Sequence, residues 1–213
     1  MTHAWKTAGG LLLLASALFP AGVDAYTVGI SAGTRMVYLR VGTGAMNGGN
    51  GSYNGGGTPG NLATINNVSV TVAANAVGNG VDQTMTGDGN TVSQWDNFQF
   101  CDPGEIYIGA FFRRPTGGGG NNNATVTATY PPNLTNASGD TIPMSQISWT
   151  SSGNGDTGGQ PFPSGSFTGS GQTIAMFGRN EFNESCHQFR YGNDLLVGAG
   201  TYTNQVTYTI TAP

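Results

Sequence analysis

The last thirteen residues of the chain, "TYTNQVTYTITAP", alternate between two kinds of side chain. The apolar and aromatic residues occupy even-numbered positions: Tyr202, Val206, Tyr208, Ile210 and Ala212. The polar residues occupy odd-numbered positions: Thr203, Gln205, Thr207, Thr209 and Thr211. Successive side chains of a strand point to opposite faces, so this pattern predicts a β-strand with one buried face and one wet face. Regular helical periodicity is hard to find anywhere in the sequence. The chain is therefore constrained to pack strands against strands.

Short stretches of the same kind recur along the chain and are separated by glycine and asparagine runs. We expect strands within residues 65–74, 93–101, 124–130, 143–152 and 172–178. The segment "EIYIGAFFRR", residues 105–114, is apolar on both faces and is expected to lie centrally in a sheet. Roughly eight to ten short strands at this spacing predict an all-β antiparallel β-sandwich in one domain.

Composition excludes several classes of partner. Glycine contributes 36 residues and charged side chains only 8%, yet Val, Ile, Tyr, Phe and Trp recur in the strand-like stretches, which is not the pattern of disorder. Beyond residue 25 the charge is six Arg minus ten Asp and Glu, which gives -4, and there is no lysine. We therefore expect no nucleic-acid partner and no attraction to an anionic membrane, because both need basic charge.

The first 25 residues carry the features of a secretory signal peptide. The apolar block "LLLLASALF" precedes a proline, and the segment ends in Val23-Asp24-Ala25, which predicts cleavage after Ala25. The apolar run is too short to span a bilayer, so no membrane span is expected. The sequence thus divides into a signal peptide (1–25), an N-terminal extension (26–34) and a β-sandwich domain (35–213) of a secreted, extracellular protein.

Two cysteines, Cys101 and Cys186, are predicted to form one disulfide, since the chain is expected to enter an oxidising compartment. A metal site or a catalytic thiol is less favoured, because only His187 adjoins a cysteine and no further ligand stands at a suitable spacing. We expect no metal and no cofactor. Acidic loops at residues 86–97 and 151–159 could offer oxygen ligands to calcium, but Asp-Gly and Asn-Gly pairs are also what tight turns require.

The segment "AYTVGISAGTRMVYLRVG" predicts two strands joined at Gly33. One face of the first strand is apolar and consists of Tyr26, Val28, Ile30 and Ala32. In the second strand Met36 and Tyr38 point one way, and Val37, Leu39 and Val41 the other. The first strand either completes its own domain or is lent to a neighbouring molecule, and the sequence leaves both possibilities open.

Few residues could support other functions. A hydrolase would have to use Glu181, Glu184 and His187 from the polar segment "RNEFNESCHQF", which alternatively only supports the disulfide. Sugars could stack on Trp95 or Tyr53, whereas the alternation around Trp149 predicts a core position. We expect a protein that is not an enzyme.

The stretches "GTYTNQVTYTITAP", "TRMVYLRVG" and "IPMSQISWTSSGNGD" resemble those of small secreted β-sandwich proteins of Gram-negative bacteria. More broadly, the chain resembles fimbrial subunits, including the chaperone-usher pilins and spore-coat-U-like proteins. This resemblance implies an immunoglobulin-like antiparallel β-sandwich that lacks one strand, and a donor strand formed by Tyr26, Val28, Ile30 and Ala32. It also implies a periplasmic chaperone and an outer-membrane usher as partners.

These features lead to an expectation and an alternative. We expect an exported structural subunit that self-associates by donor-strand exchange into a homopolymer, an extracellular filament or pilus at the cell surface. The alternative is a monomeric secreted carbohydrate-binding or adhesive module.

Overall fold

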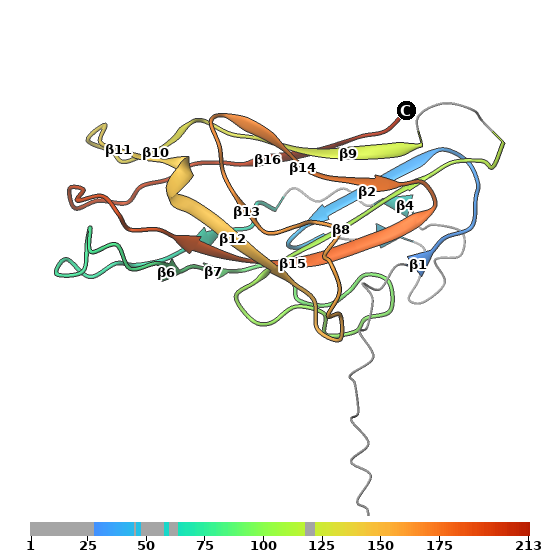
Figure 1. Ribbon diagram of the computed structural model, residues 1–213, viewed down its shortest axis with the longest axis horizontal. Helices are drawn as coiled ribbons and strands as arrows, with labels where there is room; N and C mark the ends of the chain where they lie inside the picture. The colour runs from blue at the N-terminus through green and yellow to red at the C-terminus, as the bar shows by residue number, and fades with distance from the viewer. Residues whose placement is uncertain (1–27, 45, 48–57, 60–63, 118–121) are drawn as a thin grey trace, which may run out of the picture.

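The computed structural model describes residues 28–44, 46–47, 58–59, 64–117 and 122–213 of the chain. These residues form an all-β protein in which two antiparallel sheets face each other (Figure 1). The predicted signal peptide and Tyr26 lie outside the described residues. The predicted all-β antiparallel class is confirmed, while the immunoglobulin-like topology stays a prediction.

The larger sheet is built around one long strand, β15 (Glu181–Tyr191). Its main path runs β13-β12-β15-β8-β2, with the short strands β1 and β6 also paired to β15. The bounds of these strands are β1 Val28–Gly29, β2 Met36–Val41, β6 Gln83–Thr84, β8 Ile106–Arg113, β12 Ile147–Ser152 and β13 Gly165–Ser166. As predicted, the segment 105–114 supplies a central strand, because β8 lies between β15 and β2.

The smaller sheet has the order β14-β9-β16 and forms the upper layer in Figure 1. Its strands are β9 (Asn123–Thr129), β14 (Gly171–Gly178) and β16 (Thr207–Thr211). A bulge between Thr173 and Ala175 shifts the register of β14 against β9. The predicted C-terminal strand is present in its later half, where it pairs with β9.

The main core lies between the two sheets. In β8 the residues Ile106, Ile108, Ala110 and Phe112 all point into it, and they meet Ala124, Val126 and Ala128 of β9. Alternation sends Tyr107 and Phe111 of β8 to the opposite face of the larger sheet. Because these two residues are also buried, the larger sheet must be covered on its outer face as well.

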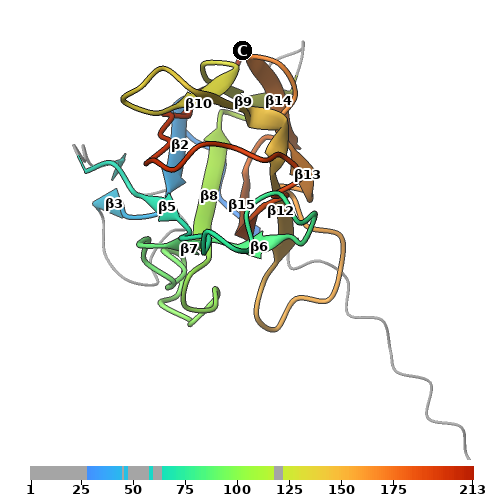
Figure 2. The ribbon, with the colours of Figure 1, turned by 90° about the vertical axis from the view of Figure 1, so that its left-hand side faces the viewer.

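Loops provide that outer cover, and they form the lower part of the molecule in Figure 2. The chain from Thr91 to Cys101 lies there, and the disulfide between Cys101 and Cys186 ties it to β15. The backbone N–H of Asn154 donates to the carbonyl of Phe100 at 2.8 Å, which attaches a second loop. The predicted disulfide is confirmed, and both cysteines are fully buried.

The remaining elements are small. They are β3 (Met46–Asn47) with β4 (Thr58–Pro59), β5 (Val68–Ser69) with β7 (Thr86–Gly87), β10 (Asn133–Thr135) with β11 (Thr141–Pro143), and the 3-10 turn η2 (Met144–Gln146). The strand expected over residues 65–74 keeps its alternation, since Val68, Val70 and Val72 are half-buried against the core. Only two of its residues pair with a neighbour, however.

Candidate functional site

The N-terminal strand β1 lies on one edge of β15. Val28 pairs with Phe182 and Gly29 with Glu181, and the N–H of Ile30 donates to the carbonyl of Asn180 at 2.8 Å. Among the described residues, this attachment to the central strand has two residue pairs and one flanking hydrogen bond, as many as that of β6 and fewer than those of β8 and β12. The N-terminal strand therefore contacts the sheet through very few backbone groups.

Beneath β1 is an apolar cluster on the outer face of the larger sheet, which we call the N-terminal cluster. It consists of buried Ile30, Tyr38, Phe111 and Phe182 with partly buried Val28, Met36 and Trp95 at its margin. The rings pack closely, with centroids 5.5 Å apart for Tyr38 and Phe111 and 5.4 Å apart for Trp95 and Phe182. Ile30 is 6% exposed, so burial of its side chain contributes about 1.5 to 3 kcal/mol.

The predicted donor-strand residues occupy different environments. Within this chain Val28 is half-buried and Ile30 is buried, as their shared parity predicts. Ala32 is exposed, because the chain bends away from the sheet between β1 and β2. Tyr26 lies outside the described residues. The apolar face that the structure describes is thus limited to two residues.

The edge of β15 that receives β1 is only partly paired. The strand β12 covers it from Cys186 to Tyr191, and β1 covers Glu181 and Phe182. Among the described residues, no strand pairs on this edge with Asn183, Glu184 or Ser185. The register of β1 places Val28 opposite Phe182, the residue that directly precedes this interval.

A buried polar network adjoins the N-terminal cluster. One carboxylate oxygen of Glu184, Oε2, accepts hydrogen bonds from the hydroxyls of Tyr107 at 2.6 Å and Ser93 at 2.7 Å. The guanidinium of Arg40 lies 4.5 Å from the centre of the Tyr107 ring, and its Nε donates to the carbonyl of Gly42 at 2.8 Å. All four side chains are buried, so the network holds strands β2, β8 and β15 against the covering loop.

Burial changes the protonation equilibria in this network. Desolvation raises the pKa of Glu184, although the two hydroxyl donors act in the opposite direction. Desolvation together with the nearby Glu184 carboxylate raises the pKa of the Tyr107 hydroxyl, so Tyr107 stays a hydrogen-bond donor. The network is therefore suited to hold a structure and presents no exposed acid or base.

Gly109 should be irreplaceable beside this network. A Cβ atom at this position would lie 2.5 Å from the Tyr107 hydroxyl oxygen and 2.7 Å from its ring. We expect Gly109→Ala to displace the ring from Glu184 and to lower the free energy of unfolding by about 1 to 3 kcal/mol. Urea denaturation would measure the loss. Gly159→Ala is the matched control, since a Cβ there meets nothing within 4 Å, and equal stabilities of the two variants would contradict the prediction.

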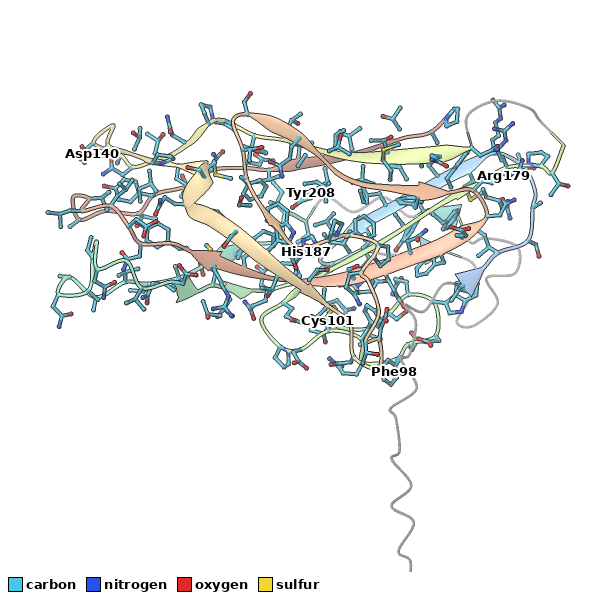
Figure 3. The ribbon with its side chains drawn as sticks, viewed as in Figure 1. Phe98, Cys101, Asp140, Arg179, His187 and Tyr208 are labelled. Atoms are coloured by element: carbon cyan, nitrogen blue, oxygen red, sulfur yellow. A yellow bond between two sulfur atoms is a disulfide. The ribbon has the colours of Figure 1, made fainter. Side chains whose placement is uncertain are left out.

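The three residues proposed for a hydrolase are not brought together. Alternation along β15 places Glu184 on the outer face and His187 on the inner face. Glu181 is half-buried and six positions from His187, which is roughly 20 Å along a strand. In the core His187 stacks on Trp149 at 5.5 Å, and its Nε2 lies 3.0 Å from the carbonyl of Phe162 (Figure 3).

The acidic loops form turns. The carboxylates of Asp96 and Asp156 accept from backbone N–H groups two residues further on, at 2.9 and 3.0 Å, as Asx turns do. Cys101, Cys186 and Glu105 place possible metal ligands within 4.8 Å of one another. Both sulfurs are already bonded to each other, so this group lacks the thiolates that would bind a metal.

The aromatic candidates are also distributed. Trp149 is in the core, as predicted, and Trp95 is half-buried against Phe182. Tyr53 lies outside the described residues. Phe98 is 51% exposed on the disulfide-tied loop (Figure 3) and was not singled out by the sequence. No periodicity marks it, because it lies in a loop.

Comparisons of the chain with protein-family models, with curated proteins and with solved structures found no match. Among the residues that the structure describes, no helix is both long and apolar enough to cross a membrane.

Proposed function

We propose that this protein is an exported structural subunit that polymerises by exchanging its N-terminal strand between copies into an extracellular filament. The observation that carries the proposal is the small attachment of β1 beside residues 183–185 of β15, which pair with β8 on one edge but with no described strand on the edge that β1 shares. A strand held by few hydrogen bonds can leave at low cost, and the same site on another copy offers it identical contacts.

The segment that joins β1 to β2 is suited to such an exchange. Ser31, Ala32, Thr34 and Arg35 are exposed, and no strand includes them. An extended segment of this length would let β1 reach a neighbour without disturbing β2. When the exchanged strand joins copies head to tail, the contact is heterologous and the chain of subunits does not close. A periplasmic chaperone and an outer-membrane usher are the export partners that this assembly would need.

Polymerisation should depend on the buried side chain of the strand. We expect the chain starting at Tyr26 to form filaments in negative-stain electron microscopy, and the chain starting at Thr34 to form none. Ile30→Asp should also abolish filaments, because it places a charge in the N-terminal cluster. Ser31→Asp is the matched control at the exposed neighbouring position and should polymerise normally.

A peptide of residues 26–33 provides the complementary test. It should bind the chain that starts at Thr34 and raise its melting temperature, and the same peptide with aspartate at position 30 should not. A full chain that elutes as a monodisperse monomer at every concentration would disprove the proposal.

A second candidate function is glycan binding by a monomeric module. The exposed ring of Phe98, with Trp95 in the same disulfide-tied loop, favours it, because sugars bind to aromatic faces on rigid loops. A monomeric full chain whose affinity for a glycan falls on Phe98→Ala would support this second candidate.

A further inference from the structure

The outer face of the smaller sheet carries a grid of threonines, which we call the threonine face. Three positions from each strand make up this face: Gly171, Thr173 and Met176 of β14, Thr125, Thr127 and Thr129 of β9, and Thr207, Thr209 and Thr211 of β16. Seven of the nine are threonine and none is charged. All are exposed or half-exposed, and the face points away from the larger sheet (Figure 1).

Strand pairing puts these residues in register. Thr127 lies opposite Thr173 on one side and Thr209 on the other, and the rows above and below follow the same pairing. Neighbouring strands are about 4.8 Å apart, and positions two residues apart on one strand are separated by about 6.7 Å. The threonines of β9 and β16 therefore form a two-dimensional lattice with these two repeats, whereas in β14 the bulge between Thr173 and Ala175 interrupts the two-residue repeat.

The geometry of the individual threonines is restricted. Branching at Cβ limits each side chain to few rotamers. In the central strand the hydroxyls of Thr127 and Thr129 donate to the carbonyls of Thr209 and Thr207, each at 3.5 Å. The hydroxyl and methyl groups consequently repeat with the backbone and present an ordered surface.

The chemistry of the threonine face excludes most partners. Without charge it cannot neutralise phosphates, and without an aromatic ring it offers sugars no stacking platform. Interfaces between proteins depend on aromatic and Arg anchors, and threonine is under-represented among the residues that supply their energy. A lattice of many equal hydroxyl and methyl contacts fits a partner that is itself periodic.

We propose that the threonine face binds ice. Water oxygens on the prism face of hexagonal ice repeat at two distances close to the strand spacing and the two-residue spacing of this grid. Hydroxyls can hydrogen-bond to water molecules at lattice positions, and methyl groups can fit between them. The site is separate from β1, which belongs to the other sheet, so it does not depend on strand exchange. A polymer would display many copies of the face and bind ice more tightly through avidity.

Inhibition of ice recrystallisation by the full secreted chain tests the proposal. We expect inhibition by the unmodified protein, and at least a tenfold higher concentration requirement for Thr127→Tyr, whose ring projects from the centre of the grid. Thr127→Val keeps the shape of the side chain but loses the hydroxyl, and the concentration that it requires for inhibition should lie between those of the unmodified protein and Thr127→Tyr. The matched control is Thr150→Tyr, at an exposed position of β12 in the other sheet, and it should be as active as the unmodified protein.

Thermal melting should show that each variant is folded, which separates a lost surface from a lost structure. If the unmodified chain inhibits no better than an inert protein of equal size, or if Thr127→Tyr retains full inhibition, the proposal is wrong. If Thr127→Tyr changes the sedimentation of the protein and the unmodified protein has no ice activity, the threonine face is a contact between copies. This result would also overturn the proposal of ice binding.

Discussion

Replacing Cys101 and Cys186 together by alanine is expected to lower the free energy of unfolding by about 3 to 5 kcal/mol. The disulfide closes a loop across 85 positions, so its loss restores much conformational freedom to the unfolded chain. Both sulfurs are fully buried beside Phe100 and Tyr107, and the substitutions also leave empty space there. Denaturation in guanidinium should show the loss, and the melting temperature should fall by roughly 2 to 4 °C for each kcal/mol.

Reduction of the unmodified protein is the control for the disulfide. Its stability should fall to that of the double variant, because both lack the same covalent link. The loop from Thr91 to Cys101 should become the first site of proteolysis, since it covers the larger sheet and the disulfide ties it to β15. A double variant within 1 kcal/mol of the unmodified protein would refute this account.

Acidification from pH 7 to pH 4 is expected to lower the free energy of unfolding by about 3 kcal/mol through the protonation of His187 alone. Burial lowers the pKa of His187 from its ordinary 6.5 to about 4. Between these pH values the unfolded chain binds more protons at this position than the folded chain does. The contribution of His187 to stability is therefore fully present above pH 6.5 and is lost as the pH falls toward 4. Each pKa unit corresponds to about 1.4 kcal/mol. The pH dependence of urea denaturation measures this loss.

Substitution isolates the contribution of His187. We expect His187→Phe, which keeps a ring against Trp149, to lose much less stability on acidification than the unmodified protein. Glu184 acts in the opposite direction, because burial raises its pKa and the folded chain then holds an extra proton above the ordinary value of 4.5. Glu184→Gln should therefore make the free energy of unfolding fall more steeply on acidification. Parallel pH profiles for the unmodified protein and His187→Phe would contradict the assignment.

Much of the fold follows from local pattern. Alternation in residues 124–130, 143–152 and 172–178 predicts strands that the structure contains, the second of them only from Ile147, because burial on one face imposes a period of two. The segment 105–114 predicts a central strand because its apolar residues occupy both faces, as burial on both faces requires. The two cysteines predict the disulfide, since two cysteines within one chain allow only one pairing.

The central strand β15 is the main element that local pattern does not identify. Its residues Asn183, Glu184 and His187 are polar, and such residues usually indicate a loop or an exposed site. They are buried because the second sheet covers one face of β15 and a loop tied by the disulfide covers the other. Partners distant in sequence hydrogen-bond to two of them: Ser93 and Tyr107 donate to Glu184, and the carbonyl of Phe162 lies 3.0 Å from Nε2 of His187.

The sequence by itself determined many of the strand positions, the antiparallel all-β class, the disulfide and the one-sided apolar pattern of Val28 and Ile30. These depend on alternation and composition, which are local properties. The sequence was wrong about the strand expected over residues 93–101, which form a loop, and it did not predict β15. Only the tertiary structure decided which strands are neighbours. It places β1 beside an interval of β15 whose edge on that side pairs with no described strand, and it puts the threonines of β9 and β16 in register. These two pairings join residues 78 to 154 positions apart, as from Thr129 to Thr207 and from Val28 to Phe182, and no local pattern encodes which partner will be met.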